Sequence, residues 1–415
     1  MKLSKLEKNW IMYDIGNSAF VMLLSTIIPI YFKNIASDDG VSLADSTAYW
    51  GYILAISTLI VAVIGPLLGS IGDNKGYKKL LFIIFVLMGS GATFLLGFFS
   101  NWVIFLIIVL IARVGFSASL IFYDAMLPDV SDDHHMDHVS SLGYAWGYIG
   151  SCLPFIICLL LILKASSLGL STSWATCIAF IITALWWFVF TLPLLKNYQQ
   201  KYYIDHKSVN LFRTSFKRLF INIKSIFHNK PLFTFLLAFF LYIDGVYTII
   251  EMATSYGKDV GISDNNLLLA LLLTQIIAFP ATIIIARLVV KIKNTTIIRL
   301  AIIGYIGITL FALQLDQAWE FWFLAVCVAL FQGSIQALSR SYFAQIIPKE
   351  MANEYFGIYD IFGKGATFLG ALIMGVASSL TGSSKNGIIG LIVILVLGLL
   401  LFNYHLKIKK RVEYI

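Results

Sequence analysis

The chain is dominated by apolar runs long enough to cross a lipid bilayer, and this feature limits its fold more than any other. A membrane-spanning helix needs about 20 apolar residues, and 59% of the 415 residues are hydrophobic while only 13% are charged. A soluble domain has about 25% charged residues, so the sequence predicts an all-α membrane protein. Twelve runs of spanning length follow one another at residues 10–32, 48–71, 79–99, 101–124, 139–163, 171–194, 231–254, 265–290, 296–315, 319–341, 355–380 and 385–407.

Lysine and arginine are concentrated in every second loop between these runs. Three lysines precede the first run, three lie within residues 75–79, and eight bases lie between Lys196 and Lys230. The alternate loops carry only Lys33, Lys164, Lys258 and Lys385. Because cytoplasmic loops hold the excess of basic residues, we expect both termini in the cytoplasm of a multi-pass protein, with a bacterial cell membrane favoured. The pattern also accounts for the net charge of +8 without a nucleic-acid partner.

One long connection, residues 195–230, divides the runs into two sets of six. We therefore expect an N-terminal six-helix bundle over residues 1–194, a cytoplasmic linker over 195–230, and a C-terminal six-helix bundle over residues 231–415. Within the linker, the stretch LFRTSFKRLFINIKSIF has apolar residues on one helical face and bases elsewhere, which predicts an amphipathic helix on the inner membrane surface. A target site for a soluble regulator is the alternative for this helix.

The two halves share features at a constant spacing, which indicates an internal duplication. Gly150 and Gly370 are 220 residues apart, as are two prolines that follow corresponding apolar runs. Near the first run of each half, MYDIGNSAF is echoed by YIDGVYTII, where Asp14 and Asp244 are 230 residues apart. Since each half has an even number of runs, the two copies are expected to be parallel and related by an axis along the membrane normal.

Several polar side chains lie inside the apolar runs, where an unpaired charge is unfavourable. Asp244 in the seventh run and Arg113 in the fourth lie near mid-membrane, and each is expected to face a partner or a water-filled cavity. They form either a structural pair between the halves or part of a substrate or proton site. Asp14 lies one turn inside the first run, where it packs with Asn17 or joins the same site. The remaining candidates are neutral amides that bind solutes or hold helices together: Gln275, Gln332 and Gln336.

The loop after the second run, GSIGDNKGYKKL, predicts a tight turn in which glycines permit close backbone approach. Its Asp73 is placed to accept hydrogen bonds from a helix N-terminus or to pair with a base, and its paired lysines to face lipid phosphates. A second gating contact is expected between Asp124 and Arg340, at matching ends of two runs, unless Arg340 reaches the headgroups instead. The candidates in this loop and in the expected gate between Asp124 and Arg340 are Gly69, Asp73, Gly76, Lys78, Lys79, Asp124 and Arg340.

The sequence predicts neither a cofactor nor a metal site. The segment SDDHHMDH, residues 131–138, has His134 and His138 one helical turn apart, which suits a transition metal, but a solvated acidic turn is the favoured interpretation. Four cysteines lie within apolar runs without metal-ligand or disulfide spacing. No nucleophile–base motif or phosphate-binding loop is present in the sequence, so we expect no enzymatic activity.

The loop GSIGDNKGYKKL resembles the cytoplasmic loop motif of the major facilitator superfamily, with Asn74 where arginine is common. The ordered stretches YDIGNSAF, FYDAMLPDVSD, SSLGYAWGYIGS, YIDGVYTII and QALSRSYFAQIIP resemble the unknown major facilitator family, which includes the autophagy-related vacuolar effluxers. The resemblance covers nearly the whole chain. It implies twelve transmembrane helices in two six-helix bundles of the major facilitator fold. It also implies that the loop residues Gly69, Asp73, Gly76, Lys78 and Lys79 take part in gating, with Asp73 as the latch at the inward gate. From the eukaryotic members it implies amino-acid efflux.

We therefore predict a secondary active transporter that moves a small polar solute by alternating access, with proton coupling and with an amino acid or related metabolite favoured. Glycines at four-residue spacing in SLGYAWGYIGSCLP favour export or exchange. A lipid or amphiphile flippase of the same fold and a non-transporting membrane scaffold are alternatives, as is an integral-membrane enzyme. The expected partners are the solute, protons and membrane lipids, and we expect a monomer.

Overall fold

The chain folds almost entirely into α-helices in a computed structural model that describes residues 2–205, 211–259, 261–381 and 384–413. The helices up to the linker are α1 (Lys5–Ser25), α2 (Ile27–Asp38), α3 (Leu43–Gly72), α4 (Tyr77–Leu95), α5 (Trp102–Ala125), α6 (Leu127–Val130), α7 (Met136–Leu163) and α8 (Thr172–Asn197). The others are α9 (Leu211–His228), α10 (Lys230–Asp259), α11 (Asp264–Leu288), α12 (Asn294–Ala312), α13 (Ala318–Ile346), α14 (Ala352–Thr381) and α15 (Ser384–Glu413). Single 3-10 turns lie at Leu96–Phe98, Ser166–Leu168 and Lys349–Met351. The predicted all-α fold is confirmed.

Eleven helical segments among the described residues are long and apolar enough to cross a membrane. Each of them coincides with one of the predicted apolar runs, as expected for a multi-pass membrane protein. The remaining run, residues 355–380, falls in α14, where several side chains lie outside the described part of the structure. Twelve spans and cytoplasmic termini therefore stay predictions.

The first predicted run, residues 10–32, is divided into two helices. α1 ends at Ser25, α2 begins two residues later, and Thr26 between them has non-helical dihedral angles (φ −130°, ψ −75°). Pro29 follows in the first turn of α2. A proline ring clashes with the carbonyl group four residues earlier, which here belongs to Ser25. Hydropathy alone does not reveal this break, because both helices are apolar.

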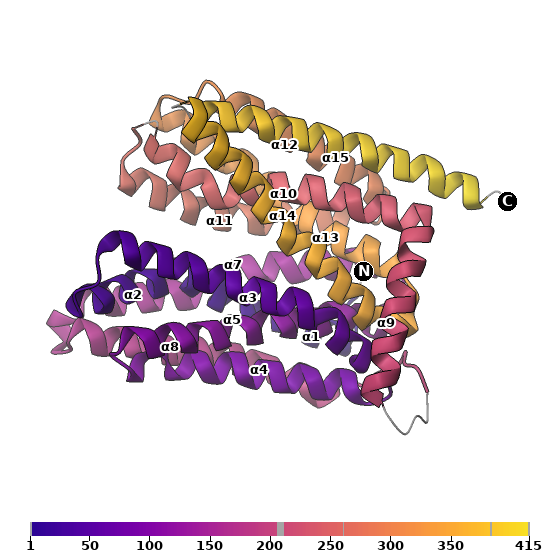
Figure 1. The fold of residues 1–415 in the computed structure, drawn as a ribbon, viewed down its shortest axis with the longest axis horizontal. Coiled ribbons are helices and arrows are strands. Elements are labelled where there is room, and N and C mark those ends of the chain that lie inside the picture. Colours follow the sequence, from indigo (N-terminus) through magenta and orange to yellow (C-terminus); the bar gives the residue numbers. More distant parts are fainter. Residues whose placement is uncertain (1, 206–210, 260, 382–383, 414–415) are drawn as a thin grey trace. The chain divides into compact units, whose positions relative to one another are not determined.

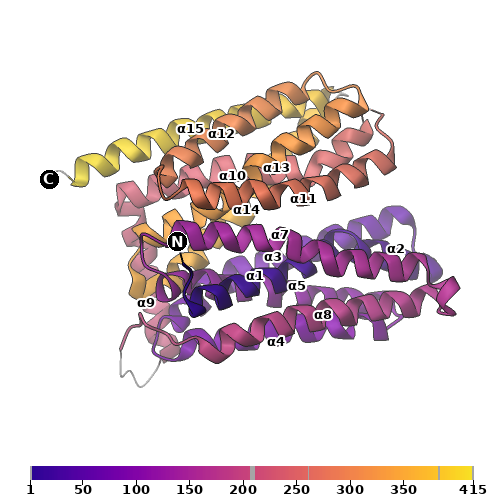
Figure 2. The same cartoon turned by 180° about the vertical axis from the view of Figure 1, so that it is seen from behind.

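The helices cluster into two compact units, each of which combines most of one half of the chain with a short segment of the other. The first unit consists of Met1–Asp132, Trp146–Val209 and Pro348–Gly357, and the second of Asp133–Ala145, Asn210–Ile347 and Ile358–Ile415. Within the first unit, α4 packs along α5 and α8, and α1 packs along α8 (Figures 1 and 2). Within the second unit, α10 packs along α15, and α13 along α11 and α12 (Figure 1). The N-terminal turn of α14 thus belongs to the first unit, and that of α7 to the second.

The linker contains α9, at the position where the sequence predicts an amphipathic helix. Leu219 and Ile226 are buried, while bases such as Lys217 and Lys224 are exposed. Large apolar side chains are also exposed along it: Phe216, Phe220, Ile221 and Phe227. Its contact with the inner membrane surface stays a prediction.

The two units repeat the same contact between corresponding helices, which supports the internal duplication. In the first unit, the hydroxyl groups of Tyr13 and Ser119 lie 2.7 Å apart. In the second, those of Tyr242 and Ser339 lie 2.6 Å apart. The serines are 220 residues apart (339 − 119), like the paired glycines, whereas the tyrosines are 229 apart (242 − 13).

The spacing of 229 makes Ile15, rather than Asp14, the counterpart of Asp244. A Cβ atom added at Gly150 would lie 2.9 Å from Ile15 Cα, and one added at Gly370 would lie 3.1 Å from Asp244 Oδ1. The two equivalent glycines therefore face the two equivalent positions. The alignment that paired Asp14 with Asp244 is displaced by one residue, and the second unit carries an acid where the first carries an isoleucine.

Candidate functional site

Asp73 follows the last residue of α3 and contacts the N-terminus of α14 within the first unit. Its Oδ1 accepts hydrogen bonds from the backbone N–H and the side-chain amide of Asn353, both at 2.8 Å, and its Oδ2 accepts one from the Glu354 N–H at 3.1 Å. The first N–H groups of a helix lack intrahelical partners and carry partial positive charge. The side chain is only 1% exposed, so water does not compete for these donors. We call this set of hydrogen bonds the Asp73–α14 contact.

Glycines allow the backbones of α3 and α14 to touch beside this contact. A Cβ atom at Gly69 would lie 2.3 Å from the carbonyl oxygen of Asn353, and one at Gly357 would lie 2.7 Å from Pro66 Cα. Any larger residue at Gly69 therefore forces the helices apart. Gly76 has a different role, because it precedes α4 with a positive φ of 83°, a conformation that glycine adopts without strain.

Burial and hydrogen bonding act in opposite directions on the Asp73 carboxyl group. Burial is the larger influence and raises the pKa of Asp73 to about 7, while Lys78 and the donors of Asn353 lower it. The group therefore exchanges between its neutral and ionised forms near neutral pH. The ionised form accepts all three hydrogen bonds, whereas protonation turns one carboxyl oxygen into a donor. Proton uptake is thus expected to weaken the Asp73–α14 contact.

Lys78 does not face lipid phosphates, because it is buried in an ion pair. Its Nζ lies 2.7 Å from Asp129 Oδ2 and donates a second hydrogen bond to the Ala125 carbonyl oxygen at 3.0 Å. Its exposed fraction is 1%. Lys79 lies nearer the surface and donates to the Tyr198 carbonyl oxygen at 3.3 Å. Lys78 therefore binds protein segments rather than headgroups, while contact of Lys79 with headgroups stays a prediction.

Residues 198–204, which we call the strap, fasten the start of the linker onto the loop that carries Asp73. The Tyr198 hydroxyl donates to Asp129 Oδ2 at 2.5 Å, and the N–H groups of Lys201 and Tyr202 donate to Asp129 Oδ1 at 3.1 and 2.9 Å. The Ile204 N–H donates to the backbone carbonyl oxygen of Asp73 at 2.8 Å. The Asp129 carboxylate thus pairs with the buried Lys78 ammonium group and also accepts hydrogen bonds from the strap.

Gln200 of the strap bridges both ends of the turn between α3 and α4. Its Oε1 accepts from the Gly76 N–H at 2.9 Å, and its Nε2 donates to the Gly72 carbonyl oxygen at 3.2 Å. Sequence reasoning did not single out Asp129, Tyr198 or Gln200. The only local signal was an acid directly after Pro128 in an acidic loop, and its partners lie about 50 and 70 residues away.

A polar cluster in the second unit surrounds the N-terminal turn of α7. Asp137 accepts hydrogen bonds from Ser341 at 2.5 Å and from Asn294 and Gln345 at 3.1 Å. Arg340 is 3% exposed and donates to the hydroxyl and carbonyl oxygens of Ser140 at 2.9 and 3.1 Å. Asp124 belongs to the other unit, so its pairing with Arg340 stays a prediction.

His138 of the same turn contacts protein rather than solvent. Its Nδ1 lies 2.6 Å from the Ala286 carbonyl oxygen, and the residue is 9% exposed. The solvated acidic turn expected at residues 131–138 is therefore wrong for Asp137 and His138, which are fixed by helices α11, α12 and α13. No group of three or more metal-ligating side chains occurs among the described residues.

Asp244 is fully buried in α10, with one carboxyl oxygen bonded and the other not. Oδ1 accepts a hydrogen bond from the Gly370 N–H at 2.9 Å, while Oδ2 has no hydrogen-bond partner among the described residues. The Thr248 hydroxyl, one helical turn further, packs on Gly370 as well. A buried carboxylate with a free oxygen is unfavourable unless it takes up a proton or a ligand.

The other predicted polar candidates are scattered over both units. Asp14 and Asn17 are buried on α1, 7% and 4% exposed, and Asn17 Nδ2 has no hydrogen-bond partner in the described part of the chain. Arg113 of α5 donates to the Thr58 hydroxyl of α3 at 3.4 Å. Since Arg113 and Asp244 belong to different units, their pairing stays a prediction. Gln336 is half-buried on α13.

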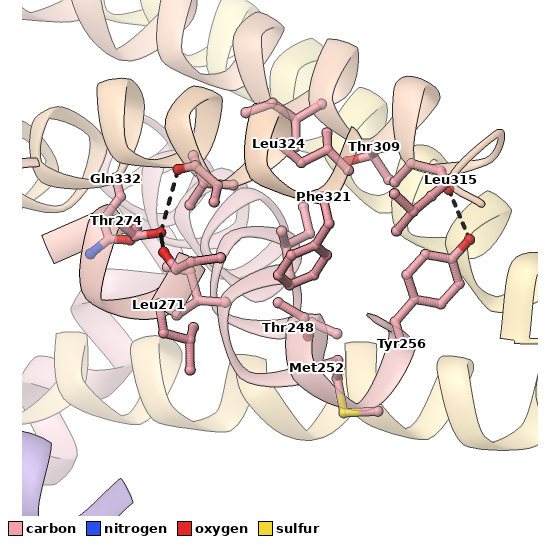
Figure 3. A pocket seen from close by; sticks show the side chains of 18 of the residues that line it. Thr248, Met252, Tyr256, Leu271, Thr274, Thr309, Leu315, Phe321, Leu324 and Gln332 are labelled. Carbon is pink, nitrogen blue, oxygen red and sulfur yellow. Dashed lines mark hydrogen bonds between the residues drawn. The ribbon is translucent and has the colours of Figure 1, made fainter. Parts of the chain in front are cut away.

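A cavity of about 110 Å³ lies inside the second unit, among α10 to α15. Two of the predicted candidates, Gln275 and Gln332, belong to its lining, which is otherwise mostly apolar. Figure 3 shows Gln332 and Thr274 at one end of the cavity and Tyr256 and Leu315 at the other.

The helices have the fold of transporters of the major facilitator superfamily. The fold is similar to that of the E. coli fucose:proton symporter FucP in its outward conformation, with a TM-score of 0.70 at 12% sequence identity, over 97% of each chain. At this level of identity the likeness shows the fold alone.

Sequence relatives place the chain within the superfamily. Residues 43–413 match the family described as vacuole effluxer Atg22 like. The MFS-type transporter YxiO of Bacillus subtilis (strain 168) is 43% identical over 408 residues, which cover 97% of this chain and 95% of YxiO. Autophagy-related protein 22 of Saccharomyces cerevisiae (strain S288c) is 23% identical over 489 residues, covering 95% and 90%. The chain belongs to the vacuole effluxer Atg22-like family, and it is a membrane transporter rather than an enzyme.

Proposed function

We propose that this chain is a secondary active transporter that exports or exchanges a small polar solute, an amino acid or a related metabolite, by alternating access. The effluxer description of the family supports solute transport, and the Bacillus relative supports a bacterial cell membrane. The proposal includes twelve spans with cytoplasmic termini, two six-helix bundles, proton coupling and a monomeric state.

Asp244 is the observation that carries proton coupling. It is 0% exposed, it occupies the position of an isoleucine in the other unit, and its Oδ2 lacks a partner among the described residues. A carboxyl group in such a place binds a proton when the site is closed and releases it when water enters. Proton release linked to solute binding is the elementary step of a proton-coupled cycle.

The Asp73–α14 contact supports alternating access. It consists of three hydrogen bonds from a helix N-terminus to one carboxyl group, and such charge-assisted bonds are each worth about 1.5–3 kcal/mol. The contact breaks as a set when α14 moves away from α3. Asp73 then acts as a latch whose loss favours the state in which the cytoplasmic ends are separated.

A solute screen followed by flux measurements tests the proposal. Purified protein is heated with amino acids, peptides, sugars and nucleosides at two pH values, and a solute that binds the native state raises the midpoint. The solute that raises it is then loaded into proteoliposomes. We expect pH-dependent efflux that Asp244→Asn abolishes and that Asp38→Asn, an exposed acid, leaves unchanged. Equal fluxes in all three proteins would remove Asp244 from the coupling mechanism.

The mostly apolar cavity keeps an amphiphile flippase as the second candidate. Its lining holds many more apolar than polar residues, which suits a hydrocarbon better than a zwitterion. The same proteoliposomes separate the two activities, because a flippase moves a labelled lipid between leaflets and leaves entrapped amino acids in place. A scaffold would move neither.

A further inference from the structure

The cavity of the second unit lies within one set of packed helices. Its apolar wall includes Phe321, Leu324, Met374 and Leu391, from α13, α14 and α15. Figure 3 shows Phe321 in the middle of the cavity wall, between the polar end at Gln332 and the end at Tyr256. None of the described lining residues carries a charge. An ionised ligand would lose its hydration here without compensation.

Three of the six described polar side chains that line the cavity are already bonded within the protein. The hydroxyls of Thr274 and Thr309 donate to Ala270 and Tyr305 carbonyl oxygens at 2.9 and 2.6 Å. The Tyr256 hydroxyl donates to a carbonyl oxygen of α12 at 2.8 Å. These groups make the wall effectively apolar, because their donors are used.

Three polar lining side chains make no hydrogen bond to any residue that the structure describes: Thr248, Gln275 and Gln332. Of the two amides, that of Gln332 is the more deeply buried. The residue is 4% exposed. A primary amide offers two donors and one acceptor oxygen, and leaving them unpaired in an apolar site is unfavourable. A ligand with one hydrogen-bonding group would satisfy the amide while its apolar part fills the cavity.

We propose that this cavity binds a small neutral molecule with an aromatic or branched apolar body and one hydrogen-bonding group, which pairs with the Gln332 amide. An engineered cavity of about 150 Å³ lined by apolar side chains binds benzene, so 110 Å³ suits a body of similar size. This proposal does not rest on the identity of the solute that the protein transports. A phenol is the simplest molecule with the required chemistry.

Fluorine NMR of 4-fluorophenol with the purified full-length protein tests this site. We expect a saturable shift of the ¹⁹F resonance. Ala325→Leu adds volume to the lining and should abolish the saturable shift, whereas Ala55→Leu, on an exposed position of α3, should preserve it. If Ala325→Leu does not purify as a folded protein, Val328→Leu fills the same wall. Thermal unfolding of each variant checks that it is folded.

A second pair of variants tests the hydrogen bond. Gln332→Met keeps the side-chain length but removes the amide, so it should weaken 4-fluorophenol binding about three- to tenfold and leave fluorobenzene binding unchanged. Gln336→Met, outside the lining on the same helix, should change neither. Absence of saturable binding would overturn the proposal, as would retained binding in Ala325→Leu. The proposal would also be overturned if Gln332→Met weakened the binding of 4-fluorophenol and of fluorobenzene equally. If a fatty acid displaced 4-fluorophenol and Gln332→Met had no effect on binding, the cavity would be an acyl-chain site instead.

Discussion

Asp73 and Asp244 are both carboxylic acids removed from water, yet their surroundings differ in what they leave unsatisfied. Asp73 accepts three hydrogen bonds from α14, so it has the partners of a structural contact that opens or closes as a set. Asp244 accepts one from Gly370 and has a second oxygen without a partner among the described residues. The first arrangement suits a latch, and the second suits a site that takes up a proton.

The stability of the protein should decrease with rising pH through the titration of Asp73. Burial raises its pKa from the ordinary 3.8 to about 7, so the native state binds this proton more tightly than the unfolded state does. The corresponding stability is full below about pH 4, is lost as the pH rises towards 7, and is constant above that. Between pH 5 and pH 8, wild type should lose about 1–3 kcal/mol of unfolding free energy relative to Asp73→Asn. Denaturant unfolding at both pH values measures this, and the same change in both proteins would contradict the assignment.

Helix contacts in the first unit depend on glycines and on charged side chains that have a bonding partner. Some of these residues could be predicted from the sequence, but their partners could not. Gly69 and Asp73 belong to a turn motif that is readable locally, but their partner Asn353 lies 280 residues beyond Asp73 and no local pattern predicts it. Lys78 was expected at the headgroups because basic residues at helix ends usually reach them. Its burial follows from Asp129, an acid that looks like an ordinary loop residue in sequence.

Gly69→Ala should destabilise the contact between α3 and α14. The added methyl group would lie 2.3 Å from the Asn353 carbonyl oxygen, and overpacking of this kind destabilises by about 1–3 kcal/mol. Gly91→Ala is the matched control, because nothing lies within 4 Å of a Cβ atom there. The control should be neutral or stabilising by up to about 1 kcal/mol. Thermal unfolding compares the two, and equal stability would show that α14 does not touch α3 in the membrane.

Removing one partner of the buried Lys78–Asp129 ion pair should destabilise the protein more than replacing both partners with apolar residues. Asp129→Asn leaves the Lys78 ammonium buried without its carboxylate and frees the strap, so we expect a loss of about 3–5 kcal/mol. Replacing both partners in Lys78→Met, Asp129→Leu removes the buried charge and should recover part of that loss. Thermal unfolding midpoints of the two variants test this, and the midpoint of the double variant should be the higher. A double variant less stable than Asp129→Asn would mean that the strap, not the charge, determines the loss.

At the scale of the whole chain, hydropathy predicted most of the architecture because a bilayer demands apolar runs of one length. The break at Thr26 was missed because Pro29 changes backbone geometry without changing hydropathy. The duplication was detected from glycines and prolines, but its register at Asp244 was displaced by one residue until Tyr13 and Tyr242 fixed it. Short sequence similarities can be aligned with such a displacement, whereas a hydrogen bond that recurs in both units fixes the alignment.

Proton movement driven by a bound solute tests the central claim most directly. Protein in liposomes that contain a pH-sensitive dye is exposed to the solute selected by the thermal screen. We predict a change of internal pH that requires the solute, is absent with Asp244→Asn, and persists with Asp38→Asn. Solute flux without any proton movement in the wild-type protein, or proton movement undiminished by Asp244→Asn, would contradict the account.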